Sequence, residues 1–141
     1  MIPLHFLLVH FPIALAISAA ICDARAHWGK RPELHRLGSA LGLGAAAGAA
    51  VAMLTGLQLL GDRAHAARAT FHAGMGLVTG LALIAIAMAR YSAGAREPDY
   101  KPSGPPSWLI LELLAAFAVA VTAITGHRLV LELLRGVSNS P

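Results

Sequence analysis

The chain has 141 residues, 57% of them hydrophobic and only 13% charged, with a net charge of +4. A soluble domain carries about a quarter charged residues, so this composition excludes an ordinary soluble protein. The length fits one domain spanning residues 1–141. The basic residues are spread through the chain with little aromatic interleaving, which argues against a nucleic-acid-binding surface.

Four apolar segments each reach the length of about 20 residues that a transmembrane helix needs. They run over residues 4–22, 37–60, 70–89 and 108–134. Because these segments occupy most of the chain, little remains for a separate soluble domain. We therefore predict an all-α integral membrane protein, an antiparallel bundle of four helices without an internal repeat.

The first segment has features of a retained span rather than a cleaved signal peptide. No basic residue precedes it, and His5, His10 and Pro12 interrupt its apolar run. Pro12 cannot donate a hydrogen bond to the carbonyl of Leu8, which predicts a kink beside His10.

The second and third segments carry glycines at a spacing of four. The pairs are Gly38 and Gly42, Gly44 and Gly48, and Gly76 and Gly80. Small residues at this spacing let a neighbouring helix approach closely. A second interpretation is that a smooth glycine face makes room for a flat macrocycle, and both can hold.

The basic residues predict the orientation in the membrane. Around the first and third connections stand seven of them: Arg25, Lys30, Arg31, Arg36, Arg90, Arg96 and Lys101. The second connection and the C-terminal tail hold four, Arg63, Arg68, Arg128 and Arg135. Because cytoplasmic loops carry an excess of Lys and Arg, we expect the first and third connections in the cytoplasm and both termini outside.

Five of the seven histidines fall on the same side of the membrane in this threading: His5, His10, His65, His72 and His127. At about 1.5 Å per helical residue, His10, His72 and His127 share one level below the surface, and His5 and His65 are shallower. Ionisable residues inside a membrane are costly, so such a cluster indicates a functional site.

Two neutral imidazoles from facing helices are what a low-spin haem b requires. We therefore predict one haem b at this end of the bundle. The axial candidates are His10, His72 and His127, paired as His10 with His72 or as His72 with His127, and His65 and His5 are secondary. Charge-assisted hydrogen bonds to the haem propionates are expected from Arg63, Arg68 and Arg128.

Several alternatives stay open at this point. Histidines can bind copper or zinc, or they can simply bond backbone carbonyls. The chain can also be a non-catalytic subunit that anchors a larger complex. Glu112 either carries protons from the cytoplasmic side or touches a quinone, or it only snorkels or caps its helix. The sequence offers no nucleophile–base–acid set, so an electron-transfer or accessory subunit is expected rather than a stand-alone enzyme. It also has no CxxCH sequence for the covalent attachment of haem.

The segment LLVHFPIALAISAAICD resembles the signature of an uncharacterised bacterial family of small four-helix membrane proteins. The family's His-Phe-Pro-Ile-Ala-Leu motif corresponds to residues 10–15. Further similarities are Leu54-Thr55-Gly56-Leu57 with Asp62, His65 with His72, and Thr125-Gly126-His127. Members often continue with a Gly-Gly pair, a Leu and a second histidine, whereas RLVLELL follows here.

The resemblance covers essentially the whole chain and implies a redox setting. Similar domains occur beside or fused to c-type cytochromes and Rieske-type proteins. The resemblance therefore implies a protein of the bacterial inner membrane that works within a larger assembly. It would transfer electrons between the quinone pool and a partner at the periplasmic face of that membrane. Quinone binding by this chain itself is compatible with that role.

Overall fold

The computed structural model describes the backbone of residues 2–31, 33–60, 67–96 and 106–138. Side chains are described for residues 5–31, 33–58, 69–92 and 108–131. The described backbone forms the helices α1 (Ile2–Trp28), α2 (Glu33–Leu60), α3 (Ala67–Arg96) and α4 (Pro106–Ser138), and contains no strand. Each helix contains one predicted apolar segment, which confirms the all-α four-helix fold.

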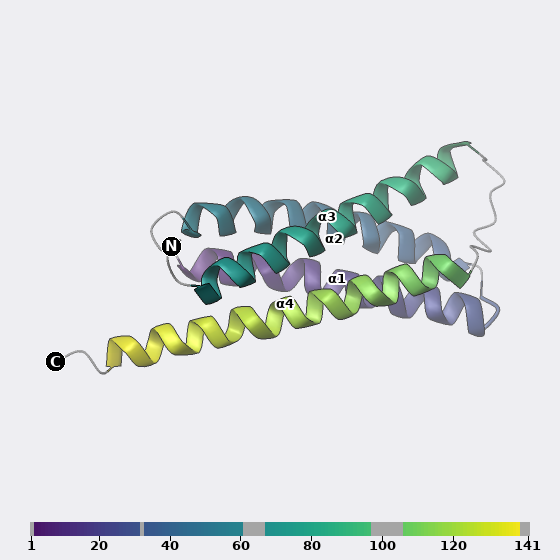
Figure 1. Cartoon of the computed structure of the whole chain (residues 1–141). Helices are drawn as coiled ribbons and strands as arrows, with labels where there is room; N and C mark the ends of the chain where they lie inside the picture. Colours follow the sequence, from purple (N-terminus) through teal and green to yellow (C-terminus); the bar gives the residue numbers. More distant parts are fainter. Residues whose placement is uncertain (1, 32, 61–66, 97–105, 139–141) are drawn as a thin grey trace.

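Each helix is long and apolar enough to cross a membrane. The candidate spans are His5–Trp28, Glu33–Gln58, Ala69–Ser92 and Trp108–Leu131. The helices run antiparallel, so that the start of α1 and the end of α4 lie at the same end of the bundle (Figure 1). α1 packs against α2 and α4, and α3 also packs against α2 and α4. α1 and α3 are therefore diagonal partners across the centre.

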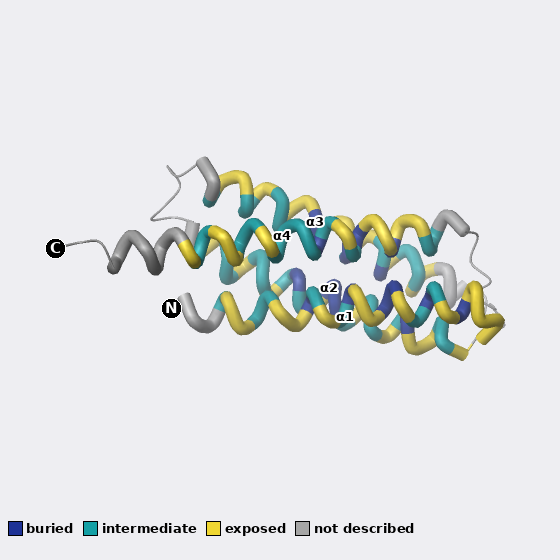
Figure 2. Tube along the Cα trace, turned by 90° about the horizontal axis from the view of Figure 1, so that it is seen from below, coloured by how far each residue is buried: buried dark blue, intermediate teal, exposed yellow. Residues whose placement is uncertain are grey.

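The centre of the bundle is built from small side chains. Its buried cluster consists of Ala16, Ala45, Ala49, Leu83, Ala115 and Val119. Larger apolar side chains such as Leu54, Phe71 and Phe117 are exposed on the outer faces, which Figure 2 shows as yellow stretches around a buried interior. Small side chains thus face the centre and large apolar ones face outward. This arrangement suits a lipid environment, because close helix contact in a membrane depends on small residues rather than on hydrophobic burial.

The glycines of α2 bring it against α1. A Cβ atom added to Gly48 would lie 3.2 Å from Cδ of the buried Pro12, and one added to Gly44 would lie 3.2 Å from Cδ1 of Leu15. The helix continues through Pro12. The predicted close approach at these glycines is confirmed, and it brings Pro12 into the α1–α2 interface.

This contact makes the Gly48→Leu variant a test of the bundle. A leucine has no space against Pro12, so we expect a loss of about 1–3 kcal/mol in stability through overpacking. Gly74 on α3 is the control, because a Cβ there meets nothing within 4 Å. Thermal unfolding in detergent should show a lower midpoint for Gly48→Leu and little change for Gly74→Leu. Equal midpoints would contradict the packing.

Candidate functional site

At the end of the bundle where α1 begins, His5 bonds to a threonine on α2. Its Nδ1 lies 2.8 Å from Oγ1 of Thr55. The Thr55 hydroxyl in turn donates to the carbonyls of Val51 at 3.0 Å and Ala52 at 3.1 Å. Because a hydroxyl has only one proton, Oγ1 accepts the bond from His5. The neutral imidazole therefore carries its proton on Nδ1 and its lone pair on Nε2.

His72 on α3 repeats this arrangement with a threonine on α4. Its Nδ1 lies 3.1 Å from Oγ1 of Thr125, and the Thr125 hydroxyl donates to the carbonyl of Thr122 at 2.8 Å. The same proton count leaves a lone pair on Nε2 of His72. The His72 ring also interacts with the backbone of Thr122. Both imidazoles are half-buried, and they belong to the diagonal helices α1 and α3.

A glycine follows each of these threonines and leaves room for the imidazole ring. A Cβ atom on Gly56 would stand 3.1 Å from Cε1 of His5. On Gly126 it would stand 2.7 Å from Cε1 of His72, closer than real contacts allow. The Thr-Gly pairs thus both bond the histidines and make space for them.

The two hairpins, α1 with α2 and α3 with α4, each carry one histidine–threonine pair. His5 and Thr55 form the pair in the first hairpin, and His72 and Thr125 form it in the second. The expectation that the chain has no internal repeat stays a prediction.

The opposite end of the bundle holds a buried ion pair. Asp23 of α1 is 4% exposed, and its partner is Arg90 of α3. Nη1 of Arg90 donates to Oδ2 of Asp23 at 2.6 Å, and Nη2 donates to Oδ1 at 3.2 Å. This two-pronged geometry is the strongest form of an arginine–carboxylate pair.

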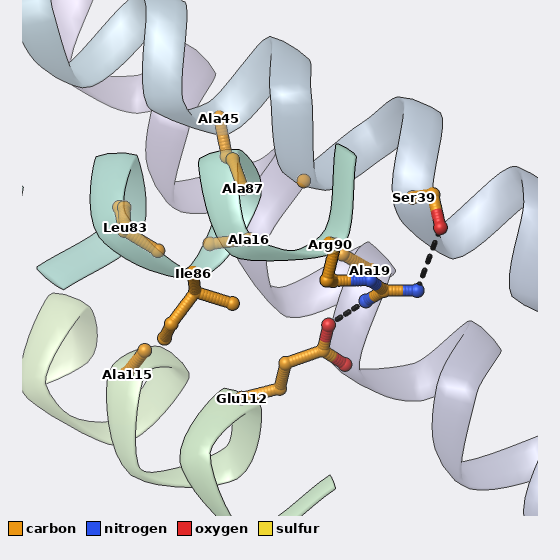
Figure 3. Close-up of a pocket in the computed structure, with 11 residues that line it drawn as sticks. Ala16, Ala19, Ser39, Ala45, Leu83, Ile86, Ala87, Arg90, Glu112 and Ala115 are labelled. Carbon is orange, nitrogen blue, oxygen red and sulfur yellow. Dashed lines mark hydrogen bonds and ion pairs between the residues drawn. The ribbon is translucent and has the colours of Figure 1, made fainter. Parts of the chain in front are cut away.

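Side chains from the other two helices complete this ionic cluster. Arg90 also donates to Oγ of Ser39 at 2.8 Å and forms an ion pair with Glu112 (Figure 3). Nδ1 of His35 lies 2.7 Å from Oδ1 of Asp23. All four helices therefore contribute a polar side chain to one buried cluster.

Sequence reasoning missed most of this cluster. Arg90 was counted with the third connection, whereas its side chain is only 14% exposed inside α3. Without Arg90, six basic residues stand around the first and third connections, against four at the second connection and the C-terminal tail. The available signal was an acidic and a basic residue at the edges of apolar segments, Asp23 and Arg90.

The predicted ligand candidates do not all meet. His72 lies in the half-buried site, but His10 and His127 are exposed, and Nδ1 of His10 bonds to the carbonyl of Phe6 at 2.6 Å. Arg128 is exposed on α4. Arg63, His65 and the side chain of Arg68 lie outside the described residues. Where side chains are described, no three His, Cys, Asp or Glu residues gather as metal ligands.

Removing the cation of the ionic cluster should destabilise the protein more than removing one anion. Arg90→Met leaves the buried Asp23 carboxylate without its cationic partner, at a cost of about 3–5 kcal/mol. Asp23→Asn leaves Arg90 paired with Glu112 and should cost less. The exposed Arg25→Met is the control, with a change within about 0.5 kcal/mol. Unfolding in detergent measures all three, and a near-neutral Arg90→Met would refute the buried pairing.

Comparison with known proteins places the chain in a family. No curated protein and no solved structure matches it. A family model described as "Predicted membrane protein (DUF2231)" matches residues 1–139, which is nearly the whole chain. This agrees with the four apolar helices and with the resemblance noted in the sequence. The chain therefore belongs to the DUF2231 family of predicted membrane proteins.

Proposed function

We propose that this protein is a haem b-binding electron-transfer subunit of a bacterial inner membrane. It would pass electrons between the quinone pool and a redox partner on the periplasmic face, c-type cytochrome-like or Rieske-like. One observation carries the proposal. His5 and His72 stand on diagonally opposed helices at one end of the bundle, each holding its proton on Nδ1 and a lone pair on Nε2.

The donor set fits a haem iron. Axial histidines in b-type sites come from facing helices of a bundle and bind through a neutral imidazole nitrogen. A histidine that ligates a metal almost always donates its other ring N–H to a protein acceptor, which fixes the ring and raises its basicity. Thr55 and Thr125 supply that acceptor for His5 and His72. The proposed axial pair is therefore His5 with His72, and His10 and His127 become the less favoured candidates.

The surroundings of the pair hold the two rings in place. Gly56 and Gly126 leave the space that the imidazoles of His5 and His72 occupy. Arg128 is exposed on α4, and we retain it with Arg63 and Arg68 as the candidates for binding propionates. When bound, a haem supplies one-electron transfer, and the residues named here hold and orient it.

The absorption spectrum of the purified protein, oxidised and reduced, tests the proposal. We expect the bands of a low-spin haem b in the wild type and their loss in His5→Ala and in His72→Ala. His10→Ala and His127→Ala are the matched controls and should keep the bands, since both side chains are exposed. Circular dichroism checks that each variant retains its helices.

Two results would count against it. A folded but colourless wild-type protein, prepared with haem supplied during expression, removes the haem proposal and favours a non-catalytic anchoring subunit. If His10→Ala loses the haem and His5→Ala keeps it, the axial pair is His10 with His72.

The threonine hydroxyls should tune the site. Thr125→Val removes the acceptor of the His72 Nδ1 proton, and the loss of such a partner lowers metal affinity about 10–100-fold. Thr125→Ser keeps the hydroxyl and should behave close to the wild type. Haem titration of the apoprotein measures both affinities. Equal affinity in the Val and Ser variants would show that the hydroxyl does not act on a bound imidazole.

A further inference from the structure

The ionic cluster borders a small cavity at the end of the bundle opposite His5 and His72. The cavity has a volume of about 30 Å³ and is lined by Ser39, Arg90, Glu112 and small residues including Ala16, Ala45 and Ala115 (Figure 3). A water molecule needs about 10–15 Å³ and two or more polar partners. The cavity therefore has both the room and the polar groups to hold water.

Glu112 presents an unpartnered oxygen at this place. Its side chain is 9% exposed, and one oxygen, Oε1, is paired with Arg90. The other oxygen, Oε2, is buried and has no hydrogen-bond partner among the described residues. An ionised carboxylate left half-satisfied within the membrane is costly, and protonation removes that charge.

One additional proton would neutralise the net charge of the ionic cluster. Asp23 and Glu112 each carry a negative charge when ionised, and Arg90 carries a permanent positive charge. These three charges sum to −1 in a low-dielectric region, and a single bound proton makes the sum zero. A neutral cluster is strongly preferred there.

Glu112 is the member best suited to take that proton. Asp23 already accepts three hydrogen bonds, two from Arg90 and one from His35, so both of its oxygens have donors. Nδ1 of His35 is engaged by its contact with Asp23. Among the described residues, Glu112 is paired with Arg90 through Oε1, and its Oε2 is left without a partner beside the cavity.

We propose that Glu112 binds one exchangeable proton, which it receives from water in the cavity. Proton uptake forms an O–H bond at Oε2 and takes the sum of these three charges from −1 to zero. In the orientation predicted from the basic residues, this proton site faces the cytoplasm. The inference does not depend on haem, because it concerns the opposite end of the bundle.

Infrared spectroscopy of the full-length protein in lipid nanodiscs tests the proposal. At neutral pH we expect the carbonyl stretch of a protonated carboxylic acid, shifted in heavy water because the proton exchanges. Glu112→Gln should remove this band. The exposed Glu33→Gln is the matched control and should keep it. Absence of the band in the wild type, or its survival in Glu112→Gln, overturns the proposal.

A second measurement needs no variant and therefore stands even if Glu112→Gln fails to fold. Wild-type protein isotope-labelled at the glutamate carboxyl carbon should show the acid band at a lower frequency. A band that does not move comes from an aspartate and overturns the assignment to Glu112. His5→Ala should keep the band whether or not it loses haem, so failure of the haem proposal and of this one are distinguishable.

Discussion

A bilayer offers no water to a polar group inside it, so every such group must find its partner within the bundle. Arg90 is the clearest response to this constraint. It lies on α3 and reaches Asp23 on α1, Ser39 on α2 and Glu112 on α4. One guanidinium thereby connects all four helices. Because diagonal helices share little direct packing, this cluster is the main link between α1 and α3 at its end.

The same constraint shapes the opposite end, with hydroxyls in place of charges. The hydroxyls of Thr55 and Thr125 donate hydrogen bonds to carbonyls of their own helices, so each accepts a hydrogen bond from its histidine. The proton of each neutral imidazole is therefore on Nδ1. Between the two polar ends lie alanines and single larger residues, Leu83 and Val119, which keep the helices close.

The diagonal helices α1 and α3 are joined by opposite charges. Asp23 of α1 and Arg90 of α3 form a two-pronged ion pair in the interior. The buried cluster at the centre combines small and larger side chains, as with Ala16 and Leu83. Such complementary pairs cannot be read from either helix alone, because each side chain is chosen to fit its partner.

The sequence by itself determined the fold class, the four spans and the small-residue contacts, because apolar length and glycine spacing are local properties. It also placed several histidines at one end, His72 among them. Depth along a helix did not distinguish the half-buried His5 from the exposed His10, since five residues turn a side chain to a different face. Only the tertiary structure decided which helix faces point inward. It thereby also decided which threonine bonds to which histidine. It also brought Asp23, His35, Arg90 and Glu112 together from four helices, because residues far apart in sequence meet only through packing.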